Sequence, residues 1–371
     1  MDIEDRRYME KVLRLAAKGR TSPNPKVGAL LVKDGRIIAT GYHHAAGLAH
    51  AEIDALAKVN HRAPGATLYV NLEPHCYHGK TPPCTDAIIE AGIREVVAGM
   101  EDPNPRVRGR GFKQLRDAGI RVRTGILEER CRRLNAPFIR AVTTGLPFII
   151  LKSAATADGH TATKTGASRW ITGDQARRYV HRLRARVDAV LVGSGTVLGD
   201  DPLLTVRWPP SYRGPMPTRI VLDRRLRSPV NAHVFNTDAP TWLLTTESAP
   251  RRRMEAFRAQ GVRVIPVACD QDDDFLPSAM RRLARDGLIE ILAEPGARLA
   301  ASLLFSGLVS RYLLFLAPKC FGGRDAPGIL GGEGVAEVSE AIPMKWERTR
   351  RLGPDLLLEA SVEAGGESEG T

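Results

Sequence analysis

Hydrophobic residues in the first third of the chain follow a strand period and a helix period in turn. The segment from Val27 to His43 places two apolar runs on either side of Asp34-Gly35, a dipeptide typical of a two-residue turn, and so predicts a β-hairpin. Strand patterns follow at 66–73, 94–100 and 120–125, and helix patterns lie at 9–17, from about His50, from Thr85, at 111–119 and at 128–142. Strands alternating with helices indicate a three-layer α/β domain.

The alternation starts again at Phe148, after a segment from Thr143 to Pro147 with the composition of a linker. Strand patterns lie at 189–195, 218–223, 241–246, 262–267, 289–294, 311–318 and from Leu356, with helices such as 174–186 and 298–304 between them. We therefore predict a second α/β domain, with the first at residues 1–145 and the second at 146–371.

The formal net charge of +12 and pI near 9.8 raise the question of nucleic-acid binding. The arginines, however, are spread along the chain, and aromatic residues make up only 5% of it, too few for a base-stacking surface. We therefore expect small phosphorylated molecules, and not nucleic acid, as the anionic partners.

The N-terminal segment is acidic and then amphipathic, without the uninterrupted apolar run of a secretory signal or a membrane span. We therefore expect a cytoplasmic protein with no membrane partner. The five cysteines are odd in number and unevenly spaced, so we expect thiols or metal ligands rather than a disulfide framework. Cys131, Cys269 and Cys320 are predicted to be small buried apolar residues.

One loop, NLEPHCYHGKTPPC, concentrates residues that bind metal ions, among them His75, Cys76 and Cys84. An H-x-E motif precedes it, with His50 and Glu52 at the predicted start of a helix. A zinc deaminase needs three protein ligands, one position open for water, and a carboxylate that moves protons without binding the metal. The pattern predicts such a hydrolytic site, with His50 on zinc and Glu52 moving protons. A purely structural zinc site, the alternative, needs a fourth protein ligand.

A second candidate site lies in the second domain, where the strand pattern at 189–195 leads into a predicted glycine-rich turn with Gly193, Gly195 and Gly199. The glycine spacing is not that of the dinucleotide fingerprint, so a tight turn is the plainer interpretation. A later strand passes through Pro295-Gly296 into a helix start, which suits a pyrophosphate because free backbone N–H groups point outward there. Asp200 and Asp201 are candidates for the acid that balances a hydride transfer.

These motifs together resemble the family of bifunctional riboflavin-biosynthesis deaminases and reductases. The matching segments cover nearly the whole chain: SPNPKVG (22–28), HAE (50–52), LEP with HGKTPPC (72–84), DPNP (102–105), DG (158–159), SRWITG (168–173), LRARVDAVLVGSGTVLGDDPLLTVR (183–207) and APK (317–319). The resemblance implies a cytidine-deaminase-like first domain with zinc and a dihydrofolate-reductase-like second domain with NADPH. It also implies a pyrimidine nucleotide substrate, and a homodimer or higher homo-oligomer.

The chain departs from the family in the metal-binding loop, where Pro74-His75 replaces Pro-Cys and Cys76 follows one place later. We favour His50, His75 and Cys84 as ligands, because Pro74 and Cys84 then keep the family spacing. Such a site carries one fewer negative charge, which makes the metal a stronger Lewis acid but holds it less tightly. A one-residue shift that brings in Cys76, or loss of zinc and of deamination, are the alternatives.

The resemblance also assigns positions in the second domain. Substrate contacts are implied at Ser168, Arg184, Leu204, Arg207 and Glu294, and cofactor contacts at Ala154, Trp170, Thr196, Asp200, Gly296, Ala297, Arg298, Leu299, Ala300, Ala301 and Ser302. Asp200 also matches the family's candidate catalytic acid. Guanidinium groups pair well with phosphate oxygens, so Arg184 and Arg207 suit a ribose phosphate. From its place at a strand end, Arg224 is a candidate for the extra phosphate of NADPH.

Three functions fit these features. The first is an enzyme that deaminates a pyrimidinone ribosyl phosphate hydrolytically and then reduces its ribosyl group to a ribityl chain with NADPH. The second is a reductase alone, with a degenerate zinc domain kept for structure. The third, a deaminase of nucleic-acid bases, is allowed by the H-x-E motif and the basic pI but leaves the second domain without a use.

Overall fold

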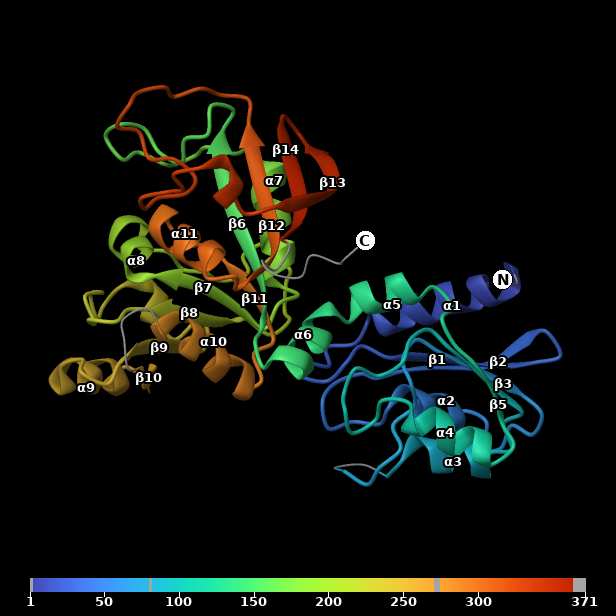
Figure 1. Cartoon of the computed structure of the whole chain (residues 1–371). Helices are drawn as coiled ribbons and strands as arrows, with labels where there is room; N and C mark the ends of the chain where they lie inside the picture. The colour runs from blue at the N-terminus through green and yellow to red at the C-terminus, as the bar shows by residue number, and fades with distance from the viewer. Residues whose placement is uncertain (1–2, 80–81, 270–273, 363–371) are drawn as a thin grey trace. The chain divides into compact units, whose positions relative to one another are not determined.

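The computed structural model describes residues 3–79, 82–269 and 274–362. The chain divides into two compact units, Met1–Gly145 and Leu146–Thr371, each with its own sheet and hydrophobic core (Figure 1). No helix in the described part of the chain is long and apolar enough to cross a membrane.

The first unit is a five-stranded sheet between two helical layers. The strands, in the order β2-β1-β3-β4-β5, are β2 Arg36–Tyr42, β1 Gly28–Lys33, β3 Thr67–Val70, β4 Glu95–Ala98 and β5 Arg121–Arg123. The helices are α1 Ile3–Ala16, α2 Ala51–Ala57, α3 Cys84–Glu90, α4 Arg110–Asp117, α5 Glu128–Leu134 and α6 Ala136–Thr144. Figure 1 shows α1 and α5 on one face of the sheet and α2, α3 and α4 on the other. The predicted three-layer α/β architecture is confirmed.

The predicted hairpin is also confirmed, as β1 and β2 pair in antiparallel register on either side of the turn. Asp34 and Gly35 both have positive φ, 50° and 71°. This left-handed pair is what a two-residue turn requires to match the twist of the strands, and aspartate and glycine adopt it at low cost.

The single helix predicted at 128–142 is wrong, because two helices, α5 and α6, meet at Asn135. Asn135 is buried, and its side chain accepts from the backbone N–H of Lys26 at 2.8 Å and donates to the Lys26 carbonyl at 3.1 Å. Pro137 has no N–H to offer a continuous helix and suits the first turn of a new one. The break therefore depends on the contact between Asn135 and Lys26, which are 109 residues apart in sequence. The periodicity of the residues around Asn135 does not indicate such a contact.

The second unit is a nine-stranded sheet in the order β10-β9-β8-β7-β11-β6-β12-β14-β13. The strands are β6 Phe148–Thr156, β7 Ala189–Gly193, β8 Thr218–Leu222, β9 Thr241–Thr246, β10 Arg263–Val267, β11 Glu290–Ala293, β12 Val309–Ala317, β13 Met344–Leu352 and β14 Asp355–Val362. The helices are α7 Asp174–Arg184, α8 Ser194–Asp200, α9 Arg251–Ala259, α10 Phe275–Arg285 and α11 Ala297–Phe305. All pairs from β10 to β12 are parallel, whereas β14 and β13 add an antiparallel edge.

Two predictions for this unit need correction. The glycine-rich turn after β7 is in fact the helix α8, which starts directly at Ser194 and contains both Gly195 and Gly199. Of the three cysteines predicted to be buried, Cys131 is fully buried, but Cys269 is half-buried and Cys320 is exposed. All five cysteines are free thiols.

A buried ion pair fastens α1 to the sheet of the first unit. The Asp5 carboxylate is 2% exposed and accepts hydrogen bonds from the Arg123 guanidinium and, at 2.8 Å, from the Tyr69 hydroxyl. Burial raises the pKa of Asp5, but these hydrogen bonds outweigh it, so the pKa is lower than usual. The pair therefore stabilises the fold above a pH of about 4, and this contribution is lost as the pH falls through the lowered pKa of Asp5.

Replacing Arg123 by leucine is expected to lower the free energy of unfolding of the first unit by about 2 to 3 kcal/mol at pH 7, because a buried carboxylate loses its charged partner. Hydrogen exchange of peptides from α1 and β5 measures the loss, which should shrink below pH 4. Arg130→Leu is the matched control, because its partner Glu10, on the same helix α1, is exposed. Equal losses in the two variants would contradict this account.

Candidate functional site

In the first unit, three candidate metal ligands meet at the starts of two helices. His50 is the residue before α2, and Cys84 is the first residue of α3. His75 lies in the loop after β3, and its carbonyl accepts hydrogen bonds from the Cys84 and Thr85 N–H groups at 2.8 and 3.2 Å. These two bonds close the loop onto the start of α3 and bring His75 beside Cys84.

The ligand atoms of His50, His75 and Cys84 all lie within 4.8 Å of one another. His50 Nδ1 is 3.1 Å from Cys84 Sγ, and the two imidazole rings are 5.3 Å apart between centroids. This group, drawn from two histidines and one cysteine, includes His75 and leaves out Cys76. The structure therefore brings the three residues of the favoured ligand set together.

The surroundings of these donors suit a bound zinc ion. Burial lowers the pKa of both His50 and His75, which keeps the rings neutral and able to donate lone pairs. His75 Nδ1 and Glu52 Oε2 are buried without a hydrogen-bond partner among the described residues, which is costly unless a ligand satisfies them. Burial also raises the pKa of Cys84 well above its usual value, and a nearby divalent cation opposes that effect.

Glu52, in the first turn of α2, is the acid expected to move protons. Its carboxyl is 3% exposed, and burial raises its pKa to about 7. It is not among the three clustered donors. A carboxyl that changes charge near neutral pH suits a general acid and base.

The sequence analysis missed His43, a buried residue beside this group. Its ring lies 5.3 Å from that of His50, with Nε2 3.2 Å from the Asn24 amide nitrogen and Nδ1 3.0 Å from the Ala49 carbonyl. An amide nitrogen donates, so Nε2 accepts and Nδ1 carries the proton. Asn24 belongs to the SPNPKVG motif, and the only sequence signal for His43 was its place at the end of the hairpin.

In the second unit, a cluster of charges gathers four of the five predicted substrate positions. Arg184, at the end of α7, donates to Glu294 at 2.7 Å and to the Thr205 carbonyl at 3.1 Å, and the Arg207 guanidinium lies 3.4 Å from the Thr205 hydroxyl. Leu204 precedes Thr205 and is buried. No contact joins Ser168 to this cluster in the described structure.

Two further residues of the cluster were not predicted. Lys152, in β6, lies 3.6 Å from Glu294, and His181, in α7, accepts the backbone N–H of Arg207 at 3.2 Å. Burial alone raises the pKa of Glu294, but Arg184 and Lys152 lower it to about 2, so the carboxylate stays charged. The sequence could have signalled His181 through its spacing of three from Arg184, which places both on one helix face.

The candidate cofactor positions lie where the sheet connections diverge. After β7 the chain continues to β8, on one side, whereas after β11 it continues to β12, on the other. In parallel α/β sheets, such a switch point leaves a crevice at the carboxyl ends of the strands. Helices α8 and α11 begin there, and the Gly296 N–H donates to the Thr196 hydroxyl at 3.0 Å. Thr196 and the segment from Gly296 to Ser302 are therefore brought together.

The remaining cofactor positions are more scattered. Trp170 is 65% exposed, lies under the Arg177 guanidinium at 4.5 Å, and has its carbonyl bonded to Lys319 at 3.0 Å. Asp200, the exposed last residue of α8, is linked to this loop through a hydrogen bond from Arg169 to its carbonyl. Ala154 lies within β6, the strand next to β11, and is in register with Phe315 of β12.

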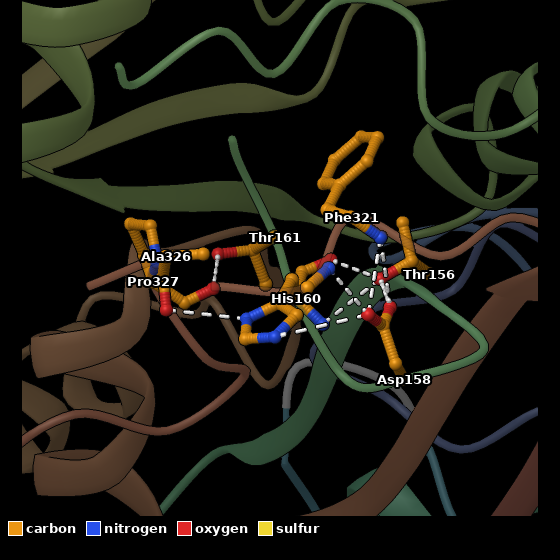
Figure 2. A network of polar contacts seen from close by, with 8 residues as sticks. Thr156, Asp158, His160, Thr161, Phe321, Ala326 and Pro327 are labelled. Carbon is orange, nitrogen blue, oxygen red and sulfur yellow. Dashed lines mark hydrogen bonds and ion pairs between the residues drawn. The ribbon is translucent and has the colours of Figure 1, made fainter. Parts of the chain in front are cut away.

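Two loops of the second unit are held together by Asp158 of the DG motif (Figure 2). Its carboxylate accepts hydrogen bonds from the Thr156 hydroxyl and from the N–H groups of Phe321 and Gly322, the latter two at 3.0 and 2.7 Å. These hydrogen bonds, above all the one from Thr156, lower the pKa of Asp158 to about 2. His160 extends the network to the Ala326 carbonyl at 3.2 Å. The DG motif therefore joins the end of β6 to the segment after β12.

Arg224, the predicted contact of the NADPH phosphate, has its guanidinium 5.7 Å from the centre of the Phe275 ring, at the start of α10. Arg227 instead donates to the Ser194 hydroxyl at 2.9 Å, at the start of α8. Of the two arginines, Arg227 is therefore the one that contacts the start of α8.

Comparisons with known proteins match both units. The cytidine and deoxycytidylate deaminase zinc-binding region matches residues 2–100, and the RibD C-terminal domain matches residues 147–358. The chain is 41% identical over 368 residues to riboflavin biosynthesis protein RibD of Escherichia coli, covering 96% of this chain and 99% of that one. It is 40% identical to RibD of Actinobacillus pleuropneumoniae, covering 97% and 96%.

Solved structures agree over the same length. An Acinetobacter baumannii RibD structure superposes with a TM-score of 0.87 at 33% identity, covering 97% of this chain and 99% of that one. The Thermotoga maritima diaminohydroxyphosphoribosylaminopyrimidine deaminase/5-amino-6-(5-phosphoribosylamino)uracil reductase superposes with a TM-score of 0.84 at 38% identity, with the same coverage.

Proposed function

Because the chain belongs to the RibD family of riboflavin biosynthesis proteins, we propose how two successive reactions are divided among its residues. It is a bifunctional enzyme, with a deaminase domain that contains a zinc-binding region and a reductase domain. We infer that its substrates are those named for the Thermotoga maritima relative: a diamino-pyrimidinone ribosyl phosphate, and then the aminouracil made from it.

For the first reaction, we propose that His50, His75 and Cys84 hold zinc in the deaminase domain. The observation that carries this proposal is the convergence of their donor atoms within 4.8 Å. When bound, zinc supplies Lewis acidity, which activates water for hydrolysis. Glu52 takes up the proton of the attacking water and delivers it to the departing amine, for which its raised pKa suits it.

For the second reaction, we propose that NADPH lies in the crevice at the starts of α8 and α11. When bound, NADPH supplies the hydride. The first N–H groups of a helix have no partner within the helix, so the start of α11, from Gly296 to Ser302, suits the pyrophosphate. Thr196, Ala154 and Trp170 complete the proposed cofactor contacts, and Asp200 is the proposed proton donor. Arg227, beside Ser194, is a better candidate than Arg224 for the extra phosphate.

The charged cluster is the proposed substrate site of the reductase. Arg184, Arg207 and Lys152 supply positive charge near the anionic end of the substrate, while Glu294 holds Arg184 in place by a hydrogen bond of 2.7 Å. Leu204 and Ser168 are the remaining proposed contacts.

We further expect a cytoplasmic enzyme that forms a homodimer or a higher homo-oligomer and has no nucleic-acid partner.

Two assays on the purified full-length protein test this division. Supplied with the diamino-pyrimidinone ribosyl phosphate, the protein should release ammonia, and supplied with the aminouracil ribosyl phosphate it should oxidise NADPH. Ammonia release without NADPH oxidation would contradict the roles proposed for the reductase residues. NADPH oxidation without ammonia release would contradict the proposed deaminase residues and would indicate a reductase with a silent zinc domain.

A further inference from the structure

His181 is a half-buried residue of α7 whose role none of the family motifs explains. Its Nδ1 lies 3.2 Å from the backbone nitrogen of Arg207, 26 residues along the chain. A backbone N–H always donates, so Nδ1 has to be the unprotonated nitrogen of the ring. The contact therefore exists only while His181 is neutral.

The segment that His181 holds is under strain. Leu204 is buried and has a φ of 54°, in the left-handed region that leucine rarely adopts. Such a conformation is strained and persists only where the surroundings enforce it. Arg184 donates to the Thr205 carbonyl at 3.1 Å, and His181 accepts from the Arg207 N–H. Two side chains on one face of α7 thus anchor the two ends of a three-residue stretch.

We propose that His181 is a positioning residue of the reductase: its neutral ring holds the backbone of Arg207, and thereby aims the Arg207 guanidinium at the phosphate of the substrate. The inference rests on the proposed reductase function. It adds a residue that does not itself touch the substrate, and it assigns that residue a tautomer, with the proton on Nε2.

The charges around His181 favour the neutral ring. Two positively charged groups face His181: Arg184 from the same helix, and Arg207 from the strained segment. Glu294 is the one negative group of the cluster, and Lys152 of β6 lies on its other side. Burial first, and then Arg184 and Arg207, lower the pKa of His181 to about 4. The hydrogen bond is therefore intact at neutral pH and is lost only as the pH falls toward 4.

Three substitutions separate positioning from simple packing. Asparagine places an oxygen at the same distance from the backbone as Nδ1, glutamine places its polar atoms one bond further out, and leucine fills the space without an acceptor. For each variant we would measure kcat and KM of the full-length enzyme with the aminouracil ribosyl phosphate and with its dephosphorylated counterpart. The KM for NADPH, the melting temperature, and ammonia release from the other domain serve as controls.

The proposal predicts that His181→Leu raises KM for the phosphorylated substrate about tenfold, as expected for loss of one hydrogen bond to a strained segment, and changes kcat little. KM for the dephosphorylated substrate should stay the same, His181→Asn should behave like the wild type, and His181→Gln should resemble His181→Leu.

The proposal is overturned if His181→Leu keeps the wild-type KM, if it affects both substrates equally, or if His181→Asn is as impaired as His181→Leu. A wild type that oxidises no NADPH with either substrate would contradict the proposed reductase function itself. This outcome is distinct from those that overturn only the role of His181.

Discussion

Replacing Glu52 by glutamine is expected to lower the rate of ammonia release by a factor of about 10² to 10⁴, the usual contribution of a general acid and base. Glutamine keeps the size of the side chain but cannot carry the proton. Zinc content should not change, because Glu52 is outside the group of three donors. NADPH oxidation with the deaminated substrate should also stay normal, because the reductase residues belong to the other unit.

The expected loss follows from how the first turn of α2 presents Glu52. Its Oε2 is buried without a hydrogen-bond partner in the described structure, so this oxygen can bond to a substrate or to water. Burial raises its pKa to about 7, close to the value at which a group both accepts and returns a proton efficiently. A structural glutamate would instead have its oxygens satisfied, as those of Glu73 are by the N–H groups of Asp102, Gly109 and Phe112.

Asp54→Asn is the matched control for Glu52→Gln. Asp54 lies on the same helix, but its carboxylate accepts from the Tyr42 N–H and the Lys58 ammonium group, away from the three donors. We expect ammonia release by this variant to stay within about threefold of the wild type, as for a partly exposed ion pair. More than a tenth of wild-type ammonia release in Glu52→Gln, measured at saturating substrate, would contradict the role given to Glu52.

Replacing Arg184 by methionine is expected to have the largest effect on the second unit. The Arg184 and Glu294 side chains are only 11% and 10% exposed, and breaking such a pair leaves a buried charge. We expect the free energy of unfolding to fall by about 3 to 5 kcal/mol. All four tryptophans, at positions 170, 208, 242 and 346, belong to this unit, so denaturation followed by tryptophan fluorescence reports on it alone.

A second substitution shows whether the loss comes from the unpaired charge. In Arg184→Met with Glu294→Gln, the buried carboxylate is gone, and we expect about half of the lost stability to return. Arg282→Met, in a more exposed pair with Asp286, should cost less than about 1 kcal/mol. A double variant as unstable as Arg184→Met would show that Arg184 acts through packing and not through its charge.

The elements of this fold could be predicted where the signal is local. Asp34-Gly35 predicts the hairpin because the turn itself demands left-handed residues, and His50 and Glu52 could be placed at a helix start from their immediate neighbours. The break at Asn135 could not, since it depends on the backbone of Lys26. The start of α8 was missed because Gly195 and Gly199 indicate a turn in the sequence. In the structure, packing against the sheet outweighs the low helix propensity of these glycines.

The candidate sites divide in the same way. His50, His75 and Cys84 could be proposed together because each stands in a motif of recognisable spacing. His43 and Lys152 could not, because each joins its site through a partner from a distant element, Asn24 and Glu294 respectively. For His181 the spacing of three from Arg184 was a signal, but its contact with Arg207 could not be predicted. Which of Arg224 and Arg227 contacts the start of α8 likewise depends on the path of the chain after β8, and not on residue type.

Zinc analysis of the purified wild type, His75→Ala and Cys76→Ala, with ammonia release measured on the same samples, tests the central claim most directly. The account predicts about one zinc per chain in the wild type and in Cys76→Ala, as for a site with three protein ligands and an open position. His75→Ala should lose most of its zinc and its ammonia release together. Zinc retained by His75→Ala but lost by Cys76→Ala, or a wild type that binds none, would contradict it.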